Sequence, residues 1–275
     1  MDFAKQLSLV HERAPLVQCI TNFVTVNDCA NVILASGGSP SKCQDPREVV
    51  DAVQGASALL CNLGAIDMVD SMLLAGREAN RLGKPVVFDP VAAGGTRLRQ
   101  DLSRKLMQEV RFSVIRGNAS EIRFLAGEGG RGSGVDVSAL DAVTEENLAQ
   151  AKTMAAGLAR RCGSVIALSG AIDVISDGQR TAVLRNGCAT MARVTGSGCM
   201  LSALTGAFCG ADPEHPFEAA VTAMAVMGVA GELAEARRLR SGTGNATFRT
   251  DLIDAVFNMT GKQLLEDINY EMDER

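Results

Sequence analysis

The sequence predicts an α/β fold in which a mainly parallel sheet is covered by helices on both faces. Short, continuous apolar runs recur along the chain, and longer stretches with helical spacing lie between them. This alternation is typical of parallel sheets, because each connection between parallel strands must cross one face of the sheet. The 275 residues are 47% hydrophobic and 21% charged, which is sufficient for a sizeable core.

Four apolar runs have the length and the polar or glycine-rich boundaries expected of buried strands. They cover residues 56–63, 85–88, 112–115 and 165–168. Helical spacing is found between these runs, at residues 68–82, 119–126 and 145–161. The order of the elements therefore predicts parallel strands joined by helices.

The pattern changes after residue 170. Two apolar segments, residues 173–176 and 181–184, flank an Asp177-Gly178 pair, which predicts a hairpin with a tight turn. Beyond the hairpin the chain is predicted to be largely helical, over residues 199–209, 217–237 and 251–266. No repeat, low-complexity tract or linker is visible, so residues 1–275 are expected to form a single domain.

Composition argues against several classes of function. The net charge is −5, with one Tyr, no Trp and no long basic run, so we expect no nucleic-acid surface. The uncharged run at residues 194–211 is rich in Gly, Ser and Thr, so we expect no membrane span there. The eight cysteines show no C-x-x-C spacing and only two histidines exist, which argues against zinc and favours a reducing cytoplasm.

Polar or glycine-rich segments directly follow each of the predicted strands. They are Asn62-Leu-Gly64, Asp89-Pro-Val-Ala-Ala-Gly-Gly95, Arg116-Gly-Asn-Ala-Ser-Glu121 and Ser169-Gly170. In open α/β sheets, ligands bind at the carboxyl ends of the strands. The sequence therefore predicts that these segments carry the chemistry.

A second type of binding signal is the turn Thr195-Gly-Ser-Gly-Cys199, which leads into an apolar helix. Gly196 and Gly198 let backbone amides converge, and the helix N-terminus adds its positive dipole end, so the turn could bind phosphate. The alternative is a tight turn before a buried helix. The G-x-G-x-x-G match at residues 127–132 follows a predicted helix rather than a strand, so we interpret it as a surface loop. No P-loop motif is present.

Cys199 is the candidate reactive side chain because it lies at the start of this helix. The helix N-terminus would lower the pKa of the thiol, whereas a neighbouring triphosphate would raise it. The residue could therefore act as a base or merely position a hydroxyl group. His11 and His215 are expected at the surface, the first in a polar helix and the second in a loop near Pro213.

Oxygen ligands of the kind that magnesium prefers occur at Asp89, Asn118 and Glu121. The alternative is structural, because Asn118 followed by Glu121 is also the pattern of a helix N-cap with an acid in the first turn. Arg116 precedes both residues at a strand end, where its guanidinium could reach a phosphate.

Together these segments resemble the hydroxyethylthiazole kinases, a thiamin-salvage family of the ribokinase-like superfamily. The resemblance rests on Ile20-Thr-Asn-Phe-Val-Thr25 with Asn27, Asn62-Leu-Gly64, Asp89-Pro-Val-Ala-Ala-Gly94, Arg116-Gly-Asn-Ala-Ser-Glu121, Ser169-Gly170 and Val194-Thr-Gly-Ser-Gly-Cys199. The segments run in family order along essentially the whole chain, and they are specific jointly.

The resemblance implies ATP-dependent phosphorylation of the primary hydroxyl of 4-methyl-5-(2-hydroxyethyl)thiazole by a cytoplasmic enzyme that uses Mg²⁺. It also implies a three-layer α/β/α homotrimer without a lid, whose substrate sites lie between subunits. The residue roles that it implies are Cys199 as catalytic residue, Arg116, Asn118 and Ser169 for ATP, Gly196, Ser197 and Gly198 for the anion hole, Asn22, Lys42, Gly64 and Gly196 for the thiazole, and Asp89 and Glu121 for the metal.

One position departs from the family pattern. Lys42 stands where the family usually has a Met that packs on the thiazole. An ammonium is costly in a closed apolar pocket, so the side chain could extend into solvent, or the substrate could be a more polar or anionic alcohol. The alternatives to a thiazole kinase are a kinase for such an alcohol, a ribokinase-like nucleotide-dependent dehydratase, and a non-catalytic nucleotide- or thiazole-binding protein.

Overall fold

The computed structural model describes residues 1–127 and 142–274, and within them nine strands form one sheet in the order β2-β1-β3-β4-β5-β6-β7-β8-β9. Neighbouring strands from β2 to β6 are parallel, whereas β7, β8 and β9 add in antiparallel fashion. The strands are β1 (Leu16–Ile20), β2 (Ser39–Ser41), β3 (Ala58–Asn62), β4 (Val86–Asp89), β5 (Val114–Asn118), β6 (Val165–Ser169), β7 (Asp173–Ser176), β8 (Arg180–Leu184) and β9 (Tyr270–Glu274). The predicted mainly parallel sheet is confirmed.

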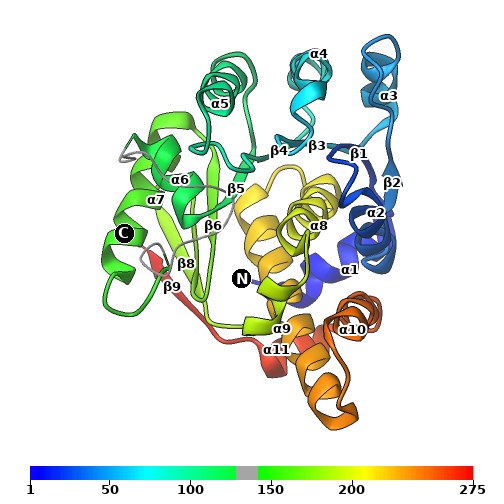
Figure 1. The fold of residues 1–275 in the computed structure, drawn as a ribbon, viewed down its shortest axis with the longest axis vertical. Helices are drawn as coiled ribbons and strands as arrows, with labels where there is room; N and C mark the ends of the chain where they lie inside the picture. The colour runs from blue at the N-terminus through cyan, green and yellow to red at the C-terminus, as the bar shows by residue number, and fades with distance from the viewer. Residues whose placement is uncertain (128–141, 275) are drawn as a thin grey trace.

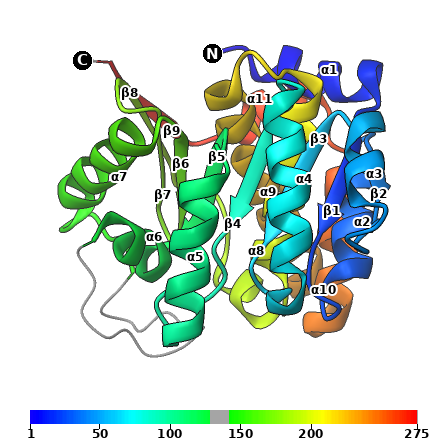
Figure 2. The same ribbon diagram turned by 90° about the horizontal axis from the view of Figure 1, so that it is seen from above.

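Helices cover both faces of this sheet (Figure 1). One face carries α3 (Val49–Gly55), α4 (Val69–Arg81), α5 (Arg97–Glu109), α6 (Ala119–Ala126) and α7 (Leu148–Cys162). The other carries α1 (Phe3–Arg13), α2 (Val26–Ala35), α8 (Ser197–Ala211), α9 (Pro216–Ser241), α10 (Asn245–Phe257) and α11 (Gly261–Asp267). Figure 2 shows α4 and α5 in front of the strands. The three-layer α/β/α fold is therefore confirmed.

Alternating side chains of each strand divide between the two cores. In β6, Val165 and Ala167 pack with α8 and α9, whereas Ile166 and Leu168 pack on the opposite face. Because both faces are covered, successive residues are all apolar. This is why the central strands are visible in the sequence as short continuous apolar runs.

The long helix α9 is apolar enough, by length and composition, to cross a membrane, but 83% of its most apolar window is buried inside the fold. It packs against α8 and α10, in the helical layer on one face of the sheet. Its apolar character is therefore explained by its place in the protein core.

Several predicted elements need correction. The helix predicted at residues 251–266 is two helices, α10 and α11, because the chain breaks at residues 258–260 and Thr260 caps α11 through a hydrogen bond from the Gln263 amide. β1, β2 and β9 were not predicted. The hairpin of β7 and β8 is confirmed, with Gly178 at φ +92°. Of the predicted glycine loop, residues 128–132 lie outside the described residues, and Gly127 ends α6.

Candidate active site

Five neighbouring strands end at the same edge of the sheet, and each delivers one or more of the predicted site residues there. Asn22 follows β1, Gly64 follows β3, Asp89 ends β4, and Ser169 ends β6. Asn118 and Arg116 both belong to the end of β5. Since the N-terminus of α8 meets this edge as well, residues from 22 to 199 gather at one place, as the strand-end rule predicts.

Cys199 lies in the first turn of α8, almost fully buried, where two amide groups contact its sulfur. Asn62 Nδ2 lies 3.2 Å from Sγ and Asn22 Nδ2 lies 3.6 Å from it. Burial and the nearby charge of Asp89 raise the pKa of the Cys199 thiol, and hydrogen bonds from Asn62 and Thr25 only partly offset this. The thiol is therefore protonated at neutral pH, and the helix terminus does not make it a thiolate.

The two carboxylate oxygens of Asp89 differ in their hydrogen bonding. Its Oδ2 accepts hydrogen bonds from Asn62 Nδ2 at 3.0 Å and from Ser202 Oγ at 2.8 Å. Its buried Oδ1 has no hydrogen-bond partner in the described part of the chain, and Arg116 Nη1 lies 3.8 Å away. Burial raises the pKa of Asp89, and the Arg116 charge opposes this effect. An orphaned carboxylate oxygen is the kind of atom that a cation or a hydroxyl group would satisfy.

Glu121 and Asn118 form a capping box at the start of α6, which confirms the structural alternative for this pair. The Glu121 amide donates to Asn118 Oδ1 at 2.9 Å, and Glu121 Oε2 accepts from the Asn118 amide at 2.8 Å. Oε1 accepts from the Ala92 amide, also at 2.8 Å. Burial, followed by the charge of Asp89, raises the pKa of Glu121 to about 7. Both carboxylate oxygens are thus engaged, and Asp89 offers the more available ligand.

The residues around this edge fit a magnesium ion held mainly by its substrate. Among the described residues, no three His, Cys, Asp or Glu side chains gather as a metal cluster. Asp89 with its free Oδ1 and Glu121 nearby supply few protein ligands, which is how Mg²⁺ is usually held when phosphates and water complete its shell.

The turn before α8 has the geometry of an anion site. Gly196 adopts φ +84°, and the first amides of the helix have no partner within the helix itself. Arg116 lies against the turn, since a Cβ on Gly198 would fall 2.7 Å from Arg116 Nη1. Arg116 Nη2 donates to Ser169 Oγ at 2.5 Å, and its buried Nε has no hydrogen-bond partner in residues 1–127 or 142–274. A guanidinium beside a helix terminus favours a phosphate.

Next to this turn is a cavity of about 520 Å³. Arg116, Ser169 and the turn at Ser197 lie together and form its polar end. The rest of the lining is largely apolar, with Asn118, Asp173 and Asn186 as its other polar side chains. The side chains that make it apolar are Val143, Met191, Leu201, Met224 and Met227. A cavity of this size, charged at one end and apolar at the other, matches a nucleotide.

Of the predicted thiazole residues, Gly196 belongs to the turn before α8, and Asn22 contacts the sulfur of Cys199. A Cβ on Gly64 would fall 2.6 Å from Asn62 Oδ1 and 2.7 Å from Asn22 Nδ2, so Gly64 lies directly against this cluster. Lys42 follows β2 and is exposed. Burial raises the pKa of the Cys19 thiol, and the positive charge of Lys42 opposes this with a smaller effect. The ammonium of Lys42 is therefore solvated in the single chain.

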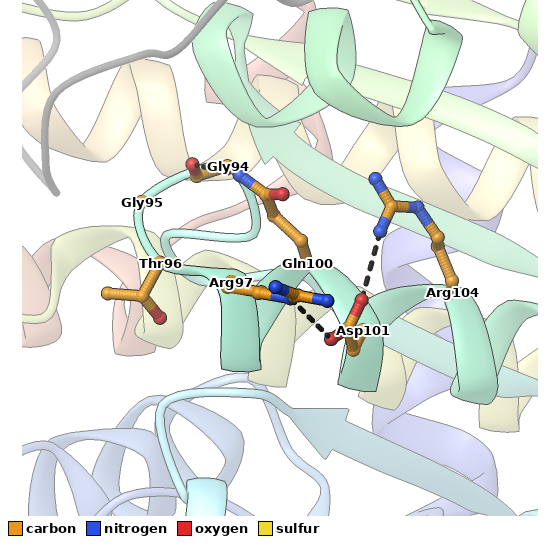
Figure 3. Close-up of a pocket in the computed structure, with 7 residues that line it drawn as sticks. All are labelled: Gly94, Gly95, Thr96, Arg97, Gln100, Asp101 and Arg104. Atoms are coloured by element: carbon orange, nitrogen blue, oxygen red, sulfur yellow. Dashed lines mark hydrogen bonds and ion pairs between the residues drawn. The ribbon is translucent and has the colours of Figure 1, made fainter.

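A separate hollow of about 470 Å³ lies beside the start of α5 (Figure 3). Asp101 lies between Arg97 and Arg104, at 3.9 and 3.1 Å, and Gln100 Nε2 donates to the Gly94 carbonyl at 3.0 Å. Gly94 and Gly95 of the predicted strand-end segment line this hollow, but none of the residues with a predicted individual role does, so we do not include it in the candidate site.

Sequence reasoning missed the direct partners of the predicted residues. Asn62 was visible only as part of a strand-end segment, although it links Asp89 to Cys199. Ser202 lies three residues after Cys199, so helical spacing alone places both on one face of α8. Asp173 gave no signal beyond its place at the start of an apolar segment.

A strand-end site with an anion-binding turn and a nucleotide-sized cavity defines a small-molecule kinase of the ribokinase-like class. The sequence profile of the Hydroxyethylthiazole kinase family matches residues 7–262. The chain belongs to the hydroxyethylthiazole kinase family.

Individual relatives agree with this assignment. The chain is 42% identical over 269 residues to a hydroxyethylthiazole kinase of Clostridium acetobutylicum, covering 97% of this chain and 98% of that protein. Its structure is similar to that of a hydroxyethylthiazole kinase protein from Pyrococcus horikoshii, with a TM-score of 0.86, 33% identity and 99% of both chains covered. A pyridoxal kinase from Staphylococcus aureus, in complex with AMP-PCP and pyridoxal, shares only the fold, with a TM-score of 0.62 and 15% identity over 94% of this chain and 98% of that one.

Proposed function

We propose that this chain phosphorylates the primary hydroxyl of 4-methyl-5-(2-hydroxyethyl)thiazole with ATP, as a thiamin-salvage enzyme, at the sheet edge around Cys199. The observation that carries the proposal is the convergence of Cys199, Asp89 and the Gly196 turn beside a nucleotide-sized cavity. Family membership supports the reaction, and this geometry supports the sheet edge as the place for it.

ATP lies in the cavity with its phosphates at the polar end. Arg116, held by Ser169, faces the negative charge, and the amides at Ser197 and Gly198 receive the transferred group. Asn118 belongs to the same cavity wall. Asp89, through its free Oδ1, and Glu121 would hold Mg²⁺, which neutralises charge on the phosphates when it is bound.

Cys199 positions the substrate hydroxyl. Since its thiol is protonated at neutral pH, we favour a positioning role over that of a base. Asn22 and Asn62 fix the sulfur, and Gly64 leaves room beside them. The substrate oxygen forms a bond to the γ-phosphorus, the bond from that phosphorus to the ADP oxygen breaks, and the hydroxyl proton passes to a phosphoryl oxygen. Alignment and charge neutralisation supply most of the acceleration.

The protein works as a homotrimer whose thiazole pockets lie between subunits, with residues 1–275 as a single domain in the cytoplasm. The exposed apolar side chains of Phe23 and Val24 adjoin Asn22, which supports a partner surface at this place. One sheet with a core on each face supports the single domain. Eight unpaired cysteines fit a reducing compartment.

Phosphorus NMR of the purified protein with MgATP and hydroxyethylthiazole tests the proposal. A phosphate monoester that grows together with ADP is the expected result. Phosphate release without an organic monoester would instead indicate a nucleotide-driven dehydratase, and intact ATP with tight binding would indicate a non-catalytic binding protein.

The variant Lys42→Met is the matched control for substrate identity. We expect it to phosphorylate the thiazole at a rate similar to that of the wild type, because the long side chain of Lys42 is exposed on the chain and can extend its ammonium into solvent. If only Lys42→Met accepts the thiazole, and the wild type accepts a more polar or anionic alcohol, the natural substrate is such an alcohol.

A further inference from the structure

Asp173 is a buried carboxylic acid that the proposed reaction does not use. It begins β7, is 9% exposed, and lines the nucleotide-sized cavity. The next residue, Val174, packs in the core on the far side of the sheet from α8 and α9, whereas Ile175 packs in the core that contains these two helices. Because side chains alternate along a strand, Asp173 faces the same side as Ile175. Among the described residues that line this cavity, Asp173 is the one acidic side chain.

The two oxygens of this carboxyl group differ. Oδ1 accepts a hydrogen bond from the Gly170 amide at 2.8 Å, which fixes the turn after Ser169. For Oδ2 the described residues provide no hydrogen-bond partner, and this atom is not among the fully buried ones. Burial raises the pKa of Asp173 to about 7, with the Gly170 amide and then Arg116 opposing it. An asparagine at this position could accept the same hydrogen bond from the Gly170 amide without burying an ionisable group. The bond to Gly170 therefore does not explain why residue 173 is an acid with a second, unpaired oxygen.

Asp173 adjoins the polar end of the cavity, because it binds the amide of Gly170, the residue after Ser169. This position selects one part of a nucleotide. The phosphates belong at Arg116 and Ser169, and the base belongs against the apolar side chains Met224 and Met227. A carboxylate facing the phosphates would be repelled. Between phosphates and base lies the ribose, whose hydroxyl groups donate hydrogen bonds, and an acidic side chain is the usual acceptor for them in nucleotide sites.

We propose that Asp173 binds a ribose hydroxyl of the nucleotide through its free oxygen and so makes the enzyme prefer ribonucleotides to deoxyribonucleotides. This inference rests on the proposed function, since it requires the nucleotide to occupy this cavity.

Binding of ATP, 2′-deoxy-ATP and 3′-deoxy-ATP by calorimetry at pH 8 tests the inference. The wild type is expected to bind at least one deoxy analogue about tenfold more weakly than ATP, because a hydrogen bond to a charged group is lost. In Asp173→Ala the ratio should fall to about one. Asp173→Asn keeps an acceptor for the Gly170 amide, and its ratio should fall below that of the wild type. Asp177→Ala, on the same hairpin but outside the cavity, should leave the ratio unchanged.

The ratio separates ribose binding from a structural role, because loosening the Gly170 turn would weaken all three nucleotides alike. Equal ratios in the wild type, Asp173→Ala and Asp173→Asn would overturn the inference. Arg116→Lys separates it from the proposed function, since it should weaken all three triphosphates without changing the ratio. Unchanged triphosphate binding in Arg116→Lys would place the nucleotide outside this cavity and refute the proposed site.

Discussion

The sulfur of Cys199 is held by two side-chain amides rather than activated by a base. The contacts from Asn62 and Asn22 fix its position, and burial keeps it protonated. Such a group contributes by alignment, so its removal should slow the chemical step without disturbing the nucleotide cavity.

We therefore expect Cys199→Ala to lower kcat about a hundredfold while the KM for ATP stays near the wild-type value. Cys199→Asp should retain more activity than Cys199→Ala, because a carboxylate can still hold the hydroxyl, although Asp89 lies close enough to oppose its charge. Steady-state kinetics with the thiazole saturating and ATP varied measures both constants. Full turnover in Cys199→Ala would show that the sulfur has no part in the reaction.

Asp173 also makes the stability of the fold depend on pH. Its pKa is raised from 3.8 to about 7, mainly by burial. Between these values the folded chain keeps a proton that the unfolded chain has lost, so unfolding releases a proton and rising pH destabilises the fold. Above the folded pKa both states are ionised and the loss stays constant.

Asp173→Asn should therefore gain stability relative to the wild type as pH rises from 4 to 7, and the difference should level off above 8. The upper limit of the gain is about 4 kcal/mol. Urea unfolding of both proteins at pH 5, 7 and 8.5 measures this, and the titration of Glu121 cancels because both proteins contain it. A difference that does not change with pH would mean that Asp173 has an ordinary pKa.

At the scale of elements, the turn that starts α8 needs glycine for two reasons. Gly196 has φ +84°, and a Cβ there would collide with the Thr25 side chain. Gly163, which ends α7 at φ +66°, has the same kind of backbone but nothing within 4 Å of such a Cβ. Alanine would therefore suffer backbone strain at both positions, but only at Gly196 would its Cβ also collide with a neighbouring side chain.

Gly196→Ala should cost about 1–3 kcal/mol of stability and lower kcat/KM for ATP at least tenfold, because the amides that face the phosphate move. Gly163→Ala should cost about 1 kcal/mol and leave the kinetics unchanged. Thermal unfolding and initial rates compare the two. Equal kinetic losses in both variants would mean that the α8 turn does not contact the nucleotide.

Helices and strands could be predicted where the pattern that specifies them lies within their own segment of sequence. The central strand β6 is a continuous apolar run because both of its faces are covered, and the capping pattern of Asn118 and Glu121 is visible in the sequence. In contrast, β2 is a three-residue edge strand that contains Pro40, and β1 contains the buried but polar Gln18. Neither segment shows a strand pattern without the neighbours that pair with it.

The same limit applies to the site. Strand ends and the glycine turn predicted which segments gather at one edge of the sheet, because those signals belong to single segments. Asn62 and Cys199, which are in contact, are 137 residues apart in the sequence. Arg116 and Ser169, which form a hydrogen bond, are 53 residues apart. Such contacts depend on which strands are neighbours in the sheet, and periodicity within a segment carries no information about that order.

At the scale of the whole molecule, the strand order brings both proposed substrate sites to one edge of the sheet. β1, β3, β4, β5 and β6 are consecutive neighbours, and α8 packs across β1, β3 and β4. The nucleotide-sized cavity lies toward β5 and β6 and is lined by residues of this chain, whereas Asn22 and Gly64 lie toward β1 and β3. The thiazole side therefore borders the exposed segment of Phe23 and Val24, where a second subunit would complete it.

This arrangement predicts that assembly and thiazole binding fail together while ATP binding survives. Phe23 is 87% exposed in the single chain, and an aspartate there would oppose burial against a partner. We expect the wild type to sediment at about three times the 28.8 kDa of one chain, and Phe23→Asp to dissociate and raise the KM for the thiazole at least tenfold. Calorimetry should show ATP binding unchanged in Phe23→Asp, because the cavity proposed for ATP is lined by residues of this chain other than Phe23. Leu98→Asp, an exposed position on α5, is the matched control and should remain trimeric. A fully active wild-type monomer would refute the shared pocket.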